Sequence, residues 1–292
     1  MPSSSFSNKK ELMFVITLGT GTFGSSSNNQ IMLRGYRASV AIDKAGGQMM
    51  STLRAQIYGV SQADMNSVTT LRWKPRSLIL TTISVYAIDG NQQTLIFQGN
   101  IVNAWANYQN QPDVFLEIQA QAAYFNQLQP VSPLSYNGQI DVSTIMGQIA
   151  SNMGYAFENN GVTTQLSNAY LPGTSIDQAK SLARAAGIDM YLDDNILAIT
   201  PPDSPRAGLV PQISPQSGLI GYPTFDGTGV NFQILFNPAV RFGGSIQVVT
   251  SIPQAAGTWI VTSIAHRLES EKPGGAWFSA VRGNPSGLAL TH

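Results

Sequence analysis

The pattern of hydrophobic and polar positions divides the chain into three segments. Up to about residue 130, runs rich in β-branched and aromatic residues follow one another, and the run 113–125 alternates apolar and polar positions as a half-buried strand does. Asp89-Gly90-Asn91 between two runs predicts a hairpin turn, and 61–68 predicts a short helix capped by Ser61. Long hairpins with one short helix are typical of a closed or split β-barrel. The predicted strands span residues 12–18, 31–42, 49–58, 78–88, 94–108 and 113–125.

The middle segment changes to a helical period. Apolar residues recur at spacings of three and four over 141–153 and 174–186, which predicts two helices. A hairpin follows, with strands 190–192 and 196–199 around the turn Asp193-Asp194-Asn195. The candidate N-caps and C-terminal glycines of the two helices are Asp141, Gly154, Thr174, Ser175 and Gly187.

The last segment returns to strands after a stretch rich in Gly, Pro and Ser at 206–229. The strands predicted there span 230–236, 245–250, 259–268 and 276–281. Proline clusters at 129–133 and 200–205 mark the two boundaries, because dense prolines stop both helices and central strands. We therefore predict a mainly β protein with an α+β insert. Its domains are a β-barrel module at 1–130, the insert at 131–205, and a linker arm with a second β module at 206–292.

The composition narrows the class of protein. Charged residues are 11% of the chain, against about 25% in ordinary domains, and 90 of the 292 residues are Gln, Asn, Ser or Thr. No apolar run approaches the ~18 residues of a spanning helix, so we expect no membrane anchor. The lack of cysteine excludes thiolate sites and disulfides, and the zero net charge argues against nucleic-acid binding by counterion release. Because interface cores are depleted in charge, the deficit favours a static assembly.

The charges are also segregated along the chain. Seven basic residues lie between Arg34 and Arg76, whereas the 103 residues 77–179 contain no Lys or Arg. The basic stretch, with its Trp73-Lys74-Pro75-Arg76 segment as a candidate contact loop, predicts a subunit interface or a solvated surface. The acidic stretch predicts the wall of a channel through which DNA passes without sticking. This prediction requires Asp89, Asp113 and Glu117 to face the lumen.

One glycine-rich stretch matches a dinucleotide fingerprint. Gly19, Gly21 and Gly24 have the spacing G-x-G-x-x-G, and Asp43 follows 19 residues later. The fingerprint needs a helix N-terminus directed at the pyrophosphate, but a strand pattern follows here. We therefore interpret it as a flexible glycine loop.

The remaining candidate chemistry is sparse. His266 lies on the half-apolar face of a predicted strand, which favours a packed structural histidine over a metal ligand. Paired carboxylates could serve a glycosidase, but both candidate pairs lie at turns or strand ends, where acids are usually solvated. The tryptophans are expected in a barrel core or subunit interface rather than on a carbohydrate platform. We predict no catalytic, cofactor-binding or metal residue and no enzymatic activity. The acid pairs and tryptophans considered are Asp193, Asp194, Glu269, Glu271, Trp73, Trp105, Trp259 and Trp277.

The order of β module, helix-plus-hairpin insert and second β module resembles a known family. The matching stretches are the insert helix and hairpin at 181–201, then 218–223, 229–238 with Gly243-Gly244, and the terminal hairpin at 257–278. They resemble the central hub proteins of contractile-tail bacteriophage baseplates. These are relatives of the late-control and Mu-type tail hub proteins and of the N-terminal part of type VI secretion spikes.

The resemblance implies a homotrimer in the virion, at the tail baseplate, assembled in the host cytoplasm. Each chain would carry two split β-barrel modules similar to the tail-tube subunit, so three chains would adapt the six-fold tube to a three-fold spike. The implied partners are the central spike protein, the tail tube or tube-initiator protein, the tape-measure protein and the baseplate wedge. DNA would pass through the lumen without specific binding. The chain is short for this family and shows no lysozyme-like segment.

Three rival functions remain open from the sequence. A tail tube or tube-initiator protein should lack the helical insert. A carbohydrate-active enzyme or binding module predicts exposed tryptophans and a close carboxylate pair. A nucleotide-binding enzyme is the third rival.

Overall fold

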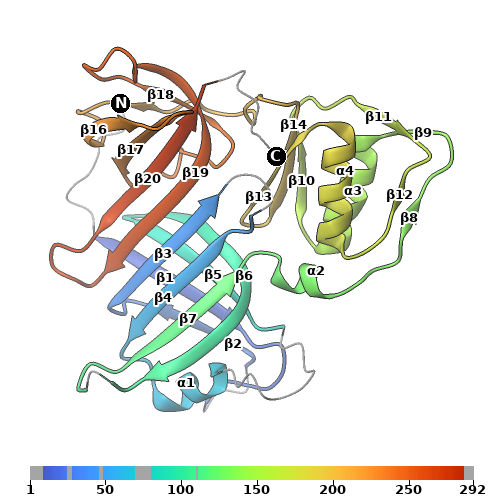
Figure 1. Ribbon diagram of the computed structural model, residues 1–292. Coiled ribbons are helices and arrows are strands. Elements are labelled where there is room, and N and C mark those ends of the chain that lie inside the picture. Colours follow the sequence, from blue (N-terminus) through green and yellow to red (C-terminus); the bar gives the residue numbers. More distant parts are fainter. Residues whose placement is uncertain (1–8, 25–27, 46–48, 70–79, 110, 286–292) are drawn as a thin grey trace. The chain divides into compact units, whose positions relative to one another are not determined.

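The computed structural model describes residues 9–24, 28–45, 49–69, 80–109 and 111–285, and Figure 1 shows its strands and helices. The chain forms two compact units. Unit 1 comprises residues 1–43, 51–124 and 265–278, and unit 2 comprises 44–50, 125–264 and 279–292. The prediction of a mainly β protein with an α+β part is confirmed, whereas the boundaries at 130 and 205 stay a prediction.

Unit 1 is an antiparallel sheet with the strand order β19-β3-β4-β7-β6-β5-β1-β2, to which β19 contributes its C-terminal half. Alternation places one face of each strand inside, where the apolar side chains form the core. Phe14, Ile42, Ile57, Ile83 and Ile118 are completely buried there. The strands are β1 (Lys10–Thr17), β2 (Gln30–Arg34), β3 (Ala38–Ala45), β4 (Thr52–Tyr58), β5 (Thr82–Asp89), β6 (Gln92–Asn107) and β7 (Phe115–Gln121).

Two predictions for unit 1 are confirmed and two are wrong. The helix α1 (Gln62–Val68) begins at its cap Ser61, and β5 and β6 form the predicted hairpin with Gly90 at a φ of +61°. The single strand expected over 31–42 is two strands, because Gly35 has a φ of +77° and turns the chain between them. We also predicted only one helix before residue 130, but there is a second, α2 (Tyr124–Leu128).

The middle of unit 2 is the predicted α+β part. Helices α3 (Val142–Met153) and α4 (Ser175–Ala186) lie side by side against a three-stranded sheet of order β10-β14-β13 (Figure 1). Both helices end at the predicted glycines in the left-handed conformation. Sequence reasoning missed β10, because it contributes only four residues in parallel to β14. The strands of this part are β8 (Leu134–Ser135), β9 (Gln139–Asp141), β10 (Ala156–Asn159), β11 (Gln165–Ser167), β12 (Tyr170–Leu171), β13 (Asp189–Asp193) and β14 (Ile196–Thr200).

The two helices begin differently. Asp141 precedes α3 as predicted, but its side chain makes no capping bond and accepts from Gln165 Nε2 at 2.8 Å instead. Thr174, rather than Ser175, caps α4. Its hydroxyl accepts from the backbone N–H of Asp177, whose carboxylate accepts in return from the N–H of Thr174, both at 3.1 Å.

We expect Thr174→Ala to lower the free energy of unfolding by about 1 kcal/mol, because the backbone N–H of Asp177 loses the hydroxyl oxygen to which it donates. Urea unfolding followed by far-ultraviolet circular dichroism measures this change. Ser181→Ala, at an exposed position inside the same helix, is the matched control and should change the free energy by less than about 0.5 kcal/mol. Equal losses in the two variants would contradict the capping role.

The rest of unit 2 is a second β module with the strand order β15-β18-β19-β20-β17-β16, in which β19 and β20 take part with the portions assigned to this unit. The stretch 206–229 was expected to be a linker arm, but it contains β15 and β16. Its glycines and prolines obscured the strand pattern. The strands are β15 (Gln212–Ile213), β16 (Leu219–Phe225), β17 (Val230–Leu235), β18 (Ser245–Val248), β19 (Gly257–Ser270) and β20 (Trp277–Asn284).

The β13–β14 hairpin and this β module share one hydrophobic core. Tyr191 and Ala198 of the hairpin pack with Phe232, Phe242 and Ile264 of the module, and the rings of Tyr191 and Phe242 meet edge to face at 5.3 Å. None of the helices in the described residues is long and apolar enough to span a membrane.

Candidate functional site

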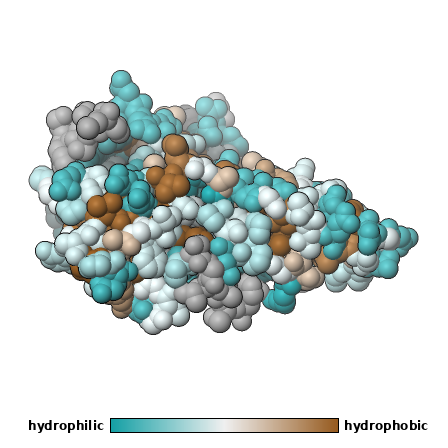
Figure 2. Space-filling model, turned by 90° about the horizontal axis from the view of Figure 1, so that it is seen from above, coloured by the Kyte–Doolittle hydropathy of each residue, from teal (hydrophilic) through white to brown (hydrophobic). Residues whose placement is uncertain are grey.

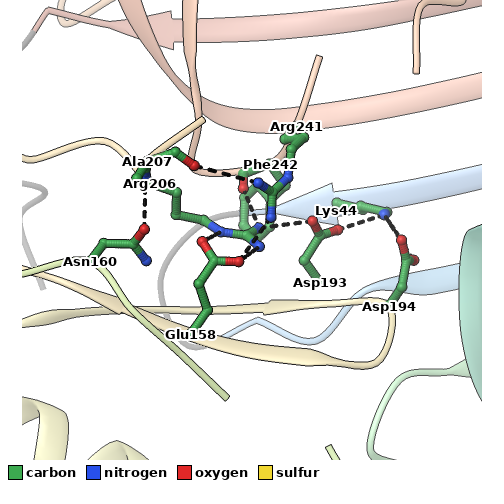
Figure 3. Close-up of polar contacts among 9 residues, drawn as sticks. All are labelled: Lys44, Glu158, Asn160, Asp193, Asp194, Arg206, Ala207, Arg241 and Phe242. Atoms are coloured by element: carbon green, nitrogen blue, oxygen red, sulfur yellow. Dashed lines mark hydrogen bonds and ion pairs between the residues drawn. The ribbon is translucent and has the colours of Figure 1, made fainter. Parts of the chain in front are cut away.

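A cluster of six charged side chains lies in unit 2, in a protein that is otherwise poor in charge (Figure 3). It combines three basic groups with three acidic ones, so its formal charges balance. The residues come from distant parts of the sequence: the end of β3, the strand β10, the β13–β14 turn, and the segments before β15 and β18. We call it the charge network, and its members are Lys44, Glu158, Asp193, Asp194, Arg206 and Arg241.

Arg206 is the centre of the charge network and is only 3% exposed. Its Nε and Nη2 donate to the two carboxylate oxygens of Glu158 at 3.2 and 2.9 Å, which is a bidentate pair. Its Nη1 donates to Asp193 Oδ2 at 2.8 Å and to the carbonyl of Phe242 at 2.9 Å. The second guanidinium, that of Arg241, donates to Glu158 Oε2 at 2.9 Å from a partly exposed position. The planar guanidinium of Arg206 therefore joins three separate elements of unit 2.

Lys44 forms the other half of the charge network. Its Nζ donates to Asp193 Oδ1 at 2.7 Å and to both oxygens of Asp194 at 2.9 Å. Asp193 thus lies between the two cations, one at each oxygen (Figure 3). An ammonium group that is 5% exposed would be costly without these acceptors.

The pKa values of the acids reflect this arrangement. Burial alone would raise the pKa of Asp193, but Lys44 and Arg206 together lower it to about 2. Burial would likewise raise the pKa of Glu158, and its two arginine partners lower it to about 2. The pKa of Asp194 is raised to about 6, because burial and the charge of Asp193 outweigh the attraction of Lys44. The pKa of Asp194 is therefore shifted in the opposite direction to the pKa values of the other two acids.

Local backbone features hold the acceptors in place. Asp194 has a φ of +55°, a left-handed conformation that aspartate tolerates, and it forms the turn that directs two consecutive carboxylates at Lys44. Gly243 has a φ of +78°, and a Cβ there would lie 2.9 Å from both Arg206 Cδ and Tyr191 Cδ1. Its carbonyl accepts from the backbone N–H of Arg206 at 2.8 Å. A glycine at 243 is therefore needed for the approach of Arg206.

The charge network corrects two expectations. Asp193 and Asp194 were expected to be solvated turn residues, but Asp193 is buried, Asp194 is half-buried, and both are paired with Lys44. Lys44 belongs to the basic stretch that was predicted to be a subunit interface or a solvated surface, but it is buried inside unit 2. The wrong premise was that turn residues are solvated, because the β13–β14 turn packs against other elements of unit 2. Two carboxylates held by cations in this way lack the free acid and free nucleophile that a glycosidase needs.

Both acids of the second candidate pair, Glu269 and Glu271, are also ion-paired. Glu269 accepts from Lys272 Nζ at 2.7 Å and from the N–H of Ala276 at 2.9 Å, and Glu271 pairs with Lys9. Among the described residues, no group of three or more His, Asp or Glu side chains is arranged to hold a metal ion.

The glycine stretch forms a loop between β1 and β2, and the described residues that follow it in sequence lead into the strand β2 rather than into a helix. A Cβ at Gly19 would lie 2.6 Å from the backbone nitrogen of Leu80, so a glycine is needed here for the two backbone segments to lie close together. Asp43 pairs with Arg267 at 2.8 Å. The interpretation as a glycine loop rather than a nucleotide site is in accord with this geometry.

His266 is buried in β19, as expected of a structural histidine. Trp277 is also buried, whereas Trp105 and Trp259 are half-buried, and the indole of Trp259 donates to the carbonyl of Ala255 at 3.0 Å. Trp73 and the segment Trp73-Lys74-Pro75-Arg76 lie outside the described residues.

The acids of the predicted channel wall lie in unit 1. Asp113 is mostly exposed and 3.9 Å from Arg37, and Glu117 is half-buried on β7. One carboxylate oxygen of Asp89, at the end of β5, is buried without a hydrogen-bond partner. Whether these acids face a lumen stays a prediction.

Sequence reasoning missed Glu158, Arg206 and Arg241 as members of one cluster. The available signal was that Glu158 is the only charged residue between Asp141 and Asp177, and that Arg206 directly follows the second proline cluster. No spacing rule connects residues that lie 48 and 149 positions apart.

Several solved structures share the fold of this chain. The chain is similar to the 43 kDa tail protein of prophage MuSo2 from Shewanella oneidensis, with a TM-score of 0.60 and 10% identity over 94% of this chain and 99% of that chain. It is also similar to a tail protein from Neisseria meningitidis MC58, with a TM-score of 0.58 and 11% identity over 94% and 98%. A third match is the E. coli c3393 protein, described as a component of the type VI secretion system that is structurally similar to the bacteriophage T4 tail proteins gp27 and gp5. Its TM-score is 0.58 and its identity 9%, over 85% of this chain and 73% of that chain. The fold is that of phage tail proteins.

The family follows from the sequence model described as Baseplate hub gp41, which matches residues 19–274. The chain belongs to this family, and the resemblance to baseplate hub proteins is confirmed. No curated protein sequence matches the chain.

Proposed function

We propose that this protein is the trimeric hub of a contractile phage tail, in which it adapts the six-fold tail tube to the three-fold central spike. The single observation that carries the proposal is the baseplate hub model matching residues 19–274. The tail-protein fold and the low charge of the chain support it. The role is structural and involves no catalysis.

The proposal includes the division into modules at 1–130, 131–205 and 206–292, the first and last resembling tube subunits. The partners are the central spike, the tube or tube-initiator protein, the tape-measure protein and the baseplate wedge. DNA passes through the lumen without specific contacts, and the acidic stretch with Asp89, Asp113 and Glu117 faces it. The protein is assembled into the virion baseplate in the host cytoplasm.

We expect the purified protein to have the mass of three chains by light scattering and to show three-fold symmetry by electron microscopy. It should also co-purify with the spike protein and the tube protein of the same phage when the three are co-expressed. A stable monomer that joins neither protein would contradict the proposal.

The rival role of tail tube or tube-initiator protein is less favoured, because such a protein should lack the helical insert formed by α3 and α4. It predicts a six-fold ring or a tube in electron microscopy, which separates it from the hub. The carbohydrate-active rival depends on a free carboxylate pair, and both candidate pairs are ion-paired.

A further inference from the structure

Exposed hydrophobic side chains gather along one edge of the second β module. On β16, Ile220 is 36%, Tyr222 75% and Phe225 51% exposed. Among the described strands β16 pairs only with β17, so the backbone groups of its other edge have no strand partner. Figure 2 shows that hydrophobic residues, in brown, reach the visible face of the molecule as separate groups between hydrophilic ones.

The exposed hydrophobic residues continue across the turn that precedes β16. The N–H of Leu219 donates to the carbonyl of Ser214 at 2.9 Å, and the N–H of Val249 donates to that of Ile213 at 2.8 Å. Val249, which is 40% exposed, therefore lies beside the same turn as Ile220. We call this surface the β16 edge, and its members are Ile220, Tyr222, Phe225 and Val249.

Charge is absent from this edge. The nineteen residues 207–225 contain no Asp, Glu, Lys or Arg. Exposed edge strands usually carry charged side chains, because lysine or glutamate prevents pairing with another chain. Here Pro223 and a register shift between Ile220 and Thr224 interrupt the ladder but leave the apolar side chains uncovered. An apolar edge of this kind is typical of a protein–protein contact.

The first β module has a free edge at β2, which differs from the β16 edge in exposing the polar Gln30 and the charged Arg34. Among the described strands β2 pairs only with β1, and its side chain Met32 is 62% exposed. Each copy of the chain therefore carries two unlike sheet edges. A closed ring of identical subunits needs two unlike surfaces on every copy, because each contact joins one surface to the other.

We propose that the β16 edge docks against the β2 edge of a second copy of this chain. This inference rests on the proposed oligomeric hub and names the surfaces that join its subunits. The exposed parts of Ile220, Tyr222 and Phe225 amount to roughly 300 Å² of apolar surface. A stable interface buries about 800 Å² on each partner, of which a little over half is apolar, so the β16 edge would supply most of that apolar area.

The first test places a charge on the β16 edge. We expect Tyr222→Lys to raise the dissociation constant of the oligomer at least tenfold, so that the protein is monomeric at concentrations where the wild type is assembled. Tyr170→Lys is the matched control, since Tyr170 is 63% exposed on β12 in the α+β part, and it should keep the wild-type mass. Light scattering gives the masses, and circular dichroism checks that both variants are folded.

The second test uses the lack of cysteine in the chain. Met32→Cys and Tyr222→Cys proteins are prepared separately, mixed, and treated with a short thiol-reactive cross-linker. We expect covalent dimers in the mixture and none in either protein alone. Cross-linking of Tyr222→Cys alone would show a symmetric contact between two β16 edges and would overturn the pairing with β2.

The outcomes separate the two proposals. An oligomer that survives Tyr222→Lys, with no cross-link in the mixture, overturns the β16–β2 contact but leaves the trimeric hub standing. A wild-type protein that stays monomeric overturns the oligomeric hub, and the contact with it.

Discussion

Arg206→Met is expected to lower the free energy of unfolding by about 3–5 kcal/mol, the largest loss for any single change in the charge network. The substitution keeps an unbranched apolar stem but removes the cation that contacts Glu158 and Asp193. These carboxylates would remain in a buried site with fewer partners, and the carbonyl of Phe242 would lose its donor. Urea unfolding followed by tryptophan fluorescence measures the loss.

Arg241→Met is the matched control, because Arg241 contacts the same Glu158 oxygen from a position where its side chain is 38% exposed. A partly exposed pair contributes about 1 kcal/mol or less, so the two variants should differ by several kcal/mol. The double variant Arg206→Met with Glu158→Gln should recover part of the loss, because it also removes the negative charge of Glu158 that would otherwise lack the Arg206 guanidinium. Losses of equal size for Arg206 and Arg241 would contradict the central role of Arg206.

The wild-type free energy of unfolding is expected to fall as the pH rises from about 4 to 6, and Asp194→Asn should remove this fall. The folded-state pKa of Asp194 is raised to about 6, above the ordinary value of 3.8, so the folded state holds a proton that the unfolded state releases earlier. The change is on the order of 2–3 kcal/mol. Below that range the sign reverses, because the lowered pKa values of Asp193 and Glu158 give stability that is lost as the pH falls from about 4 towards 2.

Urea unfolding at half-unit pH steps measures this profile. Asp226→Asn is the control of opposite sign, since hydrogen bonds from Arg282, then Thr228 and Asn231, hold the pKa of Asp226 below its ordinary value. Its profile should run parallel to that of the wild type above about pH 5. A profile for Asp194→Asn that keeps the wild-type slope between pH 4 and 6 would disprove the assignment.

Local signals in the sequence predict elements well where one period repeats over many residues. Ile145, Ile149 and Met153 share a helical face with a glycine after it, so α3 could be placed to within a residue. The strand β16 could not, because Gly221 and Pro223 interrupt its alternation and only pairing with β17 makes it a strand. Similarly, β10 exists because it adds to the edge of β14, a partner 40 residues away that no local window contains.

The candidate site was harder to predict than the fold. The sequence shows Asp193 and Asp194 as two acids in a turn, and turns are solvated unless something packs over them. Whether they are buried depends on Lys44 and Arg206, which meet them only in the folded chain. The loop form of the glycine stretch could be predicted, because it depends on the strand pattern that follows the glycines. Charge pairing over 149 residues could not.

The charge network has a consequence for how the protein is made. Lys44 leaves the ribosome 149 residues before Asp193, its first acceptor in the finished fold. At ~5–20 residues per second this interval is roughly 7–30 s, during which the ammonium group stays in water. Arg206 and Arg241 follow later still, so the charge network can close only after residue 241 has been made. A truncated product that ends before residue 241 would thus lack the complete network, and Glu158 would lack its second guanidinium partner.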